Sequence, residues 1–160
     1  GFKCVLPDGK MPIEKEINKN NLQYDKVIFE ALLKEAQSSN SNIVASAIES
    51  LSEINSQNCL KLFLEKIGED NEKIRNNSID AIVKYGPKAI KELIIALQTD
   101  NWVKRNSIII CLQRFCKLEN IYIEEIINIL LHSLNDDNPI VRCSVIKALG
   151  LAYKNYKSRN

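Results

Sequence analysis

The chain has 160 residues, of which 45% are hydrophobic and 26% are charged. A chain of this length and composition can bury a hydrophobic core without disulfides or metal ions, which indicates one globular domain and excludes a disordered or fibrous protein. Lys and Arg number 22 against 20 for Asp and Glu, without a block of like charges, so the concentrated basic footprint of a nucleic-acid-binding protein is missing.

Residues 1–21 precede the first periodic segment and contain Pro7 and Pro12, followed by a stretch rich in Lys, Glu and Asn. Proline is typical of turns, and chain ends without apolar periodicity are seldom ordered. We therefore expect a mobile N-terminal arm over 1–21. A single domain should occupy 22–160, with its first helix beginning near Tyr24.

Four segments of the chain repeat one another and align without a gap. They begin at Ser39, Asp70, Asp100 and Asp137. The aligned columns include Asp70, Asp100 and Asp137, then Asn40, Asn71, Asn101 and Asn138, then Arg75, Arg105 and Arg142, then Ile48, Ile79, Ile109 and Ile146. A Leu or Ile follows each of these isoleucines three residues later, which is the spacing of one buried helix face.

The segments before these also align, beginning at Ile28, Cys59, Ala89 and Ile126. Each carries apolar residues at its second, fifth, sixth and ninth positions, which predicts an amphipathic helix of about three turns. Their starts are 31, 30 and 37 residues apart. A repeated pair of helices that cannot bury its hydrophobic face alone indicates a solenoid. The predicted fold is therefore an all-α, α-α superhelix of about four helical hairpins.

Local signals place the helix boundaries. Asp or Ser before each apolar face can supply an N-cap oxygen, and Gly86 followed by Pro87 suits the end of one helix and the start of the next. The last predicted helix runs from near Asp137 to about Tyr156, and no return helix follows it. This helix would be uncapped, so it offers a surface for a homo- or hetero-oligomer.

The cysteines are five in number and include no CxxC pair. We interpret them as small buried hydrophobes in a reducing compartment, either the cytoplasm or the plastid stroma. One histidine and dispersed cysteines do not supply the three or four ligands of a metal site, so we expect no metal and no required cofactor. No apolar run reaches the roughly 18 residues that suggest a membrane span.

Two stretches resemble a known repeat family. Asp137–Gly150 nearly completes the pattern D-N-x-x-V-R-x-x-A-I-x-A-L-G, and Gly86–Leu97 matches its lead-in, G-P-x-A-I-x-x-L-I-x-A-L. Together with the DNW at Asp100–Trp102, they resemble the PBS-lyase HEAT-like repeats of E/F-type phycobilin lyases and related chaperone-like proteins. The resemblance covers about residues 28–152 and implies a HEAT/armadillo-like solenoid.

The resemblance also implies a function. Proteins of this family hold a phycobiliprotein client and assist covalent bilin attachment or biliprotein maturation, so a phycobiliprotein subunit is the implied partner and a linear tetrapyrrole (phycobilin) the implied bound substrate. The repeat pattern contains no catalytic residue, which leaves enzymatic activity open. The alternative is a non-enzymatic protein-protein interaction scaffold or adaptor, or a segment of a larger solenoid.

The family resemblance further implies that the Asp and Arg columns form a ladder between neighbouring hairpins. This role would fall on Asp70, Arg75, Asp100, Arg105, Asp137 and Arg142.

Contact residues are expected on the helices that line the concave face of such a stack. The candidates that do not belong to the predicted core stripe are Leu62, Glu65, Lys66, Glu92, Ile95, Ile129 and His132. Leu62, Ile95 and Ile129 are apolar at positions where solvent favours a charge, which indicates a surface for a client protein or a flat apolar ligand. The alternative is that they are scattered exposed aliphatic residues without a function. His132, the only histidine, is expected to be a solvated side chain rather than a catalytic one.

Overall fold

The computed structural model describes residues 21–118 and 122–159, and all of its regular elements are helical. The predicted arm over 1–21 therefore lies outside the described residues except for Asn21. The described elements are α1 (Asn21–Glu35), α2 (Ser41–Leu51), α3 (Gln57–Lys66), α4 (Glu72–Tyr85), the short 3-10 helix η1 (Pro87–Ala89), α5 (Ile90–Ala96), α6 (Trp102–Cys116), α7 (Ile123–Ser133) and α8 (Pro139–Arg159).

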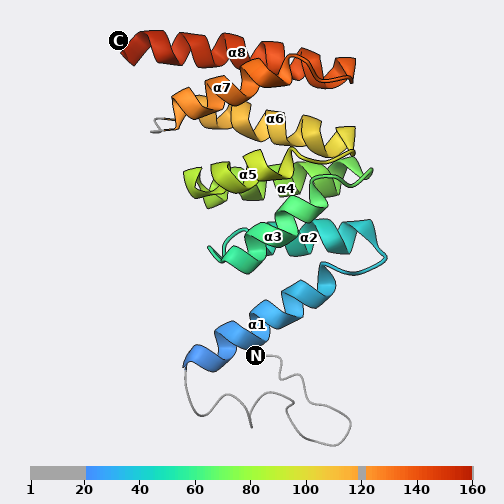
Figure 1. Cartoon of the computed structure of the whole chain (residues 1–160). Helices are drawn as coiled ribbons and strands as arrows, with labels where there is room; N and C mark the ends of the chain where they lie inside the picture. Colours follow the sequence, from blue (N-terminus) through green and yellow to red (C-terminus); the bar gives the residue numbers. More distant parts are fainter. Residues whose placement is uncertain (1–20, 119–121, 160) are drawn as a thin grey trace, which may run out of the picture.

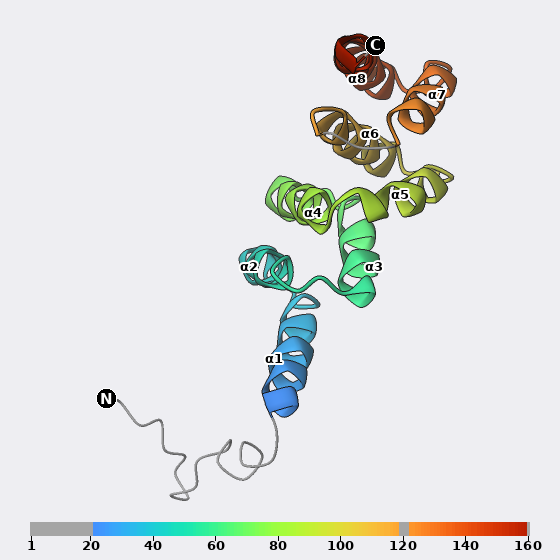
Figure 2. The same cartoon turned by 90° about the vertical axis from the view of Figure 1, so that its left-hand side faces the viewer.

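The helices pair into four hairpins that stack into a rod. α1 packs on α2, α3 on α4, α5 on α6 and α7 on α8, while α2, α4, α6 and α8 also pack on one another in succession. Figure 1 shows the hairpins ascending in chain order, and Figure 2 shows the first helices as a separate layer beside the row of second helices. The first helices make at most slight contact with one another. This arrangement confirms the predicted α-α superhelical solenoid.

The repeated apolar columns form the core between these layers. Ile48, Ile79 and Ile109 are buried, and so are Leu51, Ile82 and Leu112, which follow them by three residues. Each such side chain contributes roughly 1.5–3 kcal/mol relative to an exposed one. The core therefore runs continuously from the first hairpin to the fourth and holds the hairpins together.

The N-caps of the second helices come from the Asn column. Asn71 Oδ1 accepts from the backbone N–H of Ile74 at 3.1 Å, and Asn101 Oδ1 accepts from that of Lys104 at 3.2 Å. Asn40 and Asn138 accept from the first-turn amides of α2 and α8 in the same way. The expectation that Asp or Ser would cap these helices is corrected, because each helix begins one residue later than that assignment required.

The boundary at Gly86 agrees with its prediction. Gly86 has φ +102° and donates its backbone N–H to the Ile82 carbonyl at 3.3 Å, which ends α4. Only glycine adopts this φ without strain. Pro87 then opens η1, where its fixed φ and missing N–H carry no cost.

Candidate protein-binding surfaces

The Arg column stabilises the turn inside the second, third and fourth hairpins. Each arginine of this column donates from Nη1 to the backbone carbonyl six residues before it: Arg75 to Glu69 at 2.9 Å, Arg105 to Thr99 at 2.9 Å and Arg142 to Asp136 at 2.6 Å. These carbonyls follow the first helix, where no helical donor is left for them. The arginines therefore fix the angle between the two helices of their own hairpin.

One arginine also reaches the following hairpin. Arg105 Nε donates to Asp136 Oδ2 at 2.8 Å, and its Nη2 donates to Asp136 Oδ1 at 3.0 Å and to Asp137 Oδ1 at 2.9 Å. Among the described residues, no ion pair joins Asp70 or Asp100 to an arginine. The implied ladder is corrected accordingly: it has one step, from Arg105 to Asp137, and its main acceptor is the residue before the Asp column.

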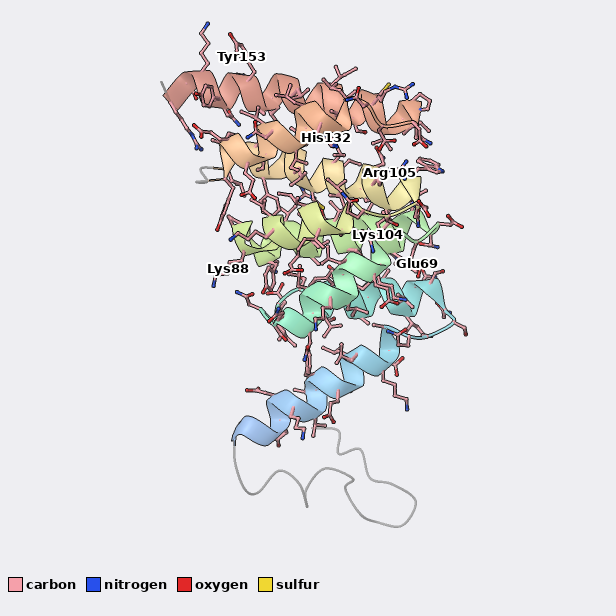
Figure 3. The ribbon with its side chains drawn as sticks, in the orientation of Figure 1. Glu69, Lys88, Lys104, Arg105, His132 and Tyr153 are labelled. Carbon is pink, nitrogen blue, oxygen red and sulfur yellow. The ribbon has the colours of Figure 1, made fainter. Side chains whose placement is uncertain are left out.

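The Arg105–Asp136 pair is a partly buried polar contact. Their side chains are 14% and 10% exposed, whereas Asp137 is 93% exposed. Burial by itself would raise the pKa of Asp136. Hydrogen bonds from Arg105 and from the Asn138 backbone outweigh this effect, so the pKa of Asp136 is lowered. The hydrogen bond to Asp136 likewise raises the pKa of Arg105. The pair stays ionised at neutral pH and joins α6 to the turn before α8, at the edge of the stack where Figure 3 labels Arg105.

Three of the predicted contact residues lie in or against the core. Leu62 is 6% exposed and belongs to the core, and Ile129 is half-buried against it. Lys66 is 9% exposed, and its Nζ lies 3.5 Å from Glu69 Oε1 and 4.0 Å from Glu65 Oε1. Long stems often pack in this way while the charged end reaches a partner. The expectation that Leu62 and Lys66 face solvent is therefore corrected.

The remaining predicted residues are exposed but do not line the inner face. Glu65, Glu92, Ile95 and His132 face solvent, and Ile95 is 66% exposed. They lie on α3, α5 and α7, the first helices, which are spread apart while the second helices pack closely (Figure 2). The closely packed second helices lie on the inside of the curved stack. The predicted contact residues, which are on the first helices, therefore belong to the outer layer. The assignment of these columns to the concave face is corrected, and their role in partner binding stays a prediction.

An apolar groove in the last hairpin was not predicted. It lies between α7 and α8 and has a volume of about 650 Å³. Its lining residues are Glu124, Ile127, Asn128, Leu131, Leu149, Tyr153 and Tyr156. Leu131 is 51% and Tyr153 64% exposed, which is far above what these residue types show in a core. The signal in the sequence was the spacing of Leu149, Tyr153 and Tyr156, three or four residues apart along α8.

A second, polar groove crosses the middle of the stack. It has a volume of about 610 Å³ between α3 and the start of α6, and its lining includes Lys61, Glu65, Thr99, Asn101 and Lys104. Charges of both signs line it. Asn101 Nδ2 donates to the Gly68 carbonyl at 3.1 Å across this junction, so the groove also holds a contact between hairpins.

The described residues offer no candidate metal site. No three His, Cys, Asp or Glu side chains within 21–118 and 122–159 are placed to hold a metal ion, and His132 stands alone on α7. Burial raises the pKa of Cys111 to about 12 and that of Cys116 to about 11, so both stay protonated thiols. Cys143 is exposed on α8. In the same part of the chain, no helix combines the length and apolar character needed to cross a membrane.

Comparison with known families supports the repeat architecture. The family model for HEAT repeats matches residues 29–113, and a second HEAT repeat model matches residues 126–156. A comparison with curated proteins finds no match. The two matches confirm the predicted HEAT repeats and do not identify the PBS-lyase type among them.

Proposed function

Because this chain belongs to the HEAT-repeat family, we propose that it is a protein-binding scaffold whose client docks at the C-terminal hairpin. The observation that supports this best is the apolar groove between α7 and α8, where Leu131 and Tyr153 remain largely exposed. Contiguous apolar surface of this kind marks interaction sites on soluble domains. Aromatic side chains at its rim are also the residue type most enriched at binding hot spots.

Site-directed photo-crosslinking tests this proposal. Leu131 is replaced by benzoylphenylalanine, and Ile95, which is similarly exposed on α5, receives the same replacement as the matched control. Irradiation in extract of the native source should join a stoichiometric protein partner at position 131 and not at position 95. Equal cross-linking at both positions, or none at either, would contradict the proposal.

We further propose a narrower form, in which the client is a phycobiliprotein subunit and the scaffold assists covalent attachment of a bilin. The similarity of Gly86–Leu97 and Asp137–Gly150 to PBS-lyase repeats supports this form. The contribution of the chain would be to hold client and pigment in a reactive orientation, which can supply much of a barrier without a dedicated nucleophile. A linear tetrapyrrole is flat and largely apolar, which suits an open apolar groove.

Co-expression tests the narrower form. The chain is produced together with a bilin and candidate phycobiliprotein subunits, and a denaturing gel is inspected for covalent bilin fluorescence. A fluorescent subunit that disappears with Leu131→Asp but not with Ile95→Asp is the expected result. If no subunit gains colour while Leu131 still cross-links a partner, the adaptor without enzymatic role is the correct function.

A further inference from the structure

The last helix leaves exposed a face that the equivalent helices bury. Ile48, Ile79 and Ile109 occupy one column of the repeat and are fully or almost fully buried, whereas Ile146 in the same column is 61% exposed. α7 covers α8 as the other first helices cover their partners. The difference therefore comes from the next second helix, which packs on α2, α4 and α6 but has no counterpart above α8 among the described residues (Figure 1).

Ile146 belongs to a longer exposed stripe. Ile140, Cys143, Ile146, Gly150 and Tyr153 follow one another at three- or four-residue spacing along α8, and all are exposed. This spacing places them on one face of the helix. Tyr153 shares its column with Cys116, which is fully buried in α6. We name this face, from Ile140 to Tyr153, the end face.

Every charged residue of α8, the helix that carries the end face, is basic. α8 contains no acidic residue and five basic ones: Arg142, Lys147, Lys154, Lys157 and Arg159. Lys157 Nζ lies 6.0 Å from the centre of the Tyr153 ring. At earlier junctions, opposite charges of successive hairpins pair: Lys84 of α4 with Glu53, two residues after the end of α2, and Arg114 of α6 with Asp80 of α4. In both pairs the earlier hairpin supplies the acidic residue, whereas α8 is basic, so an occupant that pairs with α8 must carry acidic side chains.

Arg142 specifies where one of these acidic groups should lie. Arg105, in the same column, uses Nε and Nη2 to bind the two carboxylates that precede α8. Arg142 donates from Nη1 to its own turn, and in the described part of the chain no carboxylate lies within ion-pair distance of it. The equivalent partner of Arg142 is a carboxylate just before the first turn of the occupant.

We propose that the end face of α8 docks an acidic amphipathic helix of a partner protein, in the position that the second helix of a following hairpin would take. The apolar side of the partner helix covers Ile140, Ile146 and Tyr153, and its acidic residues pair with Arg142, Lys147 and Lys154. This inference rests on the proposed scaffold function and adds a second surface and the chemistry of its ligand.

Two synthetic peptides serve as probes of this site. Both follow residues 135–157 and keep the apolar residues, with serine in place of Cys143. The acidic peptide keeps both aspartates and carries glutamate at each basic position, while the basic peptide keeps the lysines and arginine and carries asparagine at both aspartate positions. Fluorescence anisotropy of the labelled peptides against the full chain should detect binding of the acidic peptide only. Raised salt should weaken it, since exposed charges are screened.

Point variants assign the binding to the end face. Ile146→Asn should weaken the acidic peptide about tenfold, the usual loss at a central apolar contact, while Ile95→Asn, equally exposed on α5, should leave it unchanged. Lys147→Gln should weaken it severalfold, and Lys88→Gln, exposed on η1, should have no effect. Thermal melting shows whether each variant is folded, and all four changes lie at exposed positions that seldom alter folding.

Several results would overturn the proposal. They are equal binding of both peptides, equal losses from Ile146→Asn and Ile95→Asn, or binding of anionic phospholipid vesicles without binding of the acidic peptide. Concentration-dependent sedimentation that Ile146→Asn abolishes would assign the end face to a second copy of the chain. A native protein whose mass exceeds that of this chain by at least one further hairpin would show that the occupant belongs to the same polypeptide. Loss of peptide binding with intact cross-linking at Leu131 would reject this inference alone and leave the scaffold function standing.

Discussion

Replacing Asp136 with Asn tests whether the partly buried Arg105–Asp136 ion pair holds the last hairpin on the stack. The Asp136 carboxylate accepts two hydrogen bonds from Arg105, at 2.8 and 3.0 Å, and one from the Asn138 backbone at 2.9 Å. Asparagine keeps the shape but replaces one carboxylate oxygen by a donor, which leaves a guanidinium N–H without an acceptor at a site only 14% exposed. We expect Asp136→Asn to lower the free energy of unfolding by about 2–3 kcal/mol.

Asp137 supplies the matched control, because Asp137→Asn also removes one carboxylate that pairs with Arg105. Asp137 is 93% exposed, so its loss should cost no more than about 0.5 kcal/mol. Urea unfolding followed by circular dichroism measures both variants. Equal effects of the two substitutions would refute the claim that burial makes the Arg105–Asp136 pair important.

The pH dependence of the Asp136→Asn effect gives a second check. The pKa of Asp136 is lowered in the folded protein, so the folded state keeps this carboxylate ionised to a lower pH than the unfolded chain does. The stabilisation is complete above the unfolded pKa, about 4, and is lost as the pH falls through the lower folded value. The difference between wild type and Asp136→Asn should therefore be constant from about pH 7 to pH 5 and shrink below about pH 4. A difference that is unchanged at low pH would show that the ion pair is not its source.

Three further predictions concern single side chains. Ile79→Ala should cost about 2–5 kcal/mol of unfolding free energy through a core cavity, while Ile95→Ala should stay within about 0.5 kcal/mol, as urea titration can establish. Leu62→Glu, which places a carboxylate in the core, should lower the melting temperature or prevent folding, and an unchanged melting curve would restore Leu62 to the surface. In the folded protein a thiol reagent should modify Cys143 rapidly and Cys111 only on unfolding, since Cys111 is buried and its pKa is raised to about 12; peptide mass spectrometry distinguishes the two.

The architecture was predictable because the same pattern occurs four times in the sequence, and each copy supports the interpretation of the others. A single segment such as that around Ile79 fits many helical folds, but four aligned segments with one buried column permit little besides a stack of hairpins. The exact residue at which each helix begins was harder to predict. Adjacent Asp and Asn side chains, as at Asp70 and Asn71, can both cap a helix, and only the observed start of α4 decides between them.

The binding surface was predicted less well, for a physical reason. Periodicity locates the centre of a buried stripe but not its width. In α3, Leu62 and the stem of Lys66 are buried beyond the stripe that Leu60 and Phe63 define, so the buried face is wider than the periodicity indicates. The role of Asp136 was equally hidden, because it depends on how far the Arg105 side chain reaches across a junction between hairpins.

The two proposed surfaces meet at Tyr153, which lines the groove and also ends the exposed stripe of α8. Burying Ile140, Ile146 and Tyr153 would contribute roughly 1.5–3 kcal/mol per side chain, and association itself costs about 4–15 kcal/mol. A single helix on the end face should therefore bind with modest affinity, and its charge pairs mainly select and steer the partner. A client could fill the α7–α8 groove with one segment and place an acidic helix on the end face with another. The two weak contacts would then be linked within one molecule. Such a bivalent client should bind far more tightly than either contact alone, which is the behaviour expected of a scaffold that retains a specific partner.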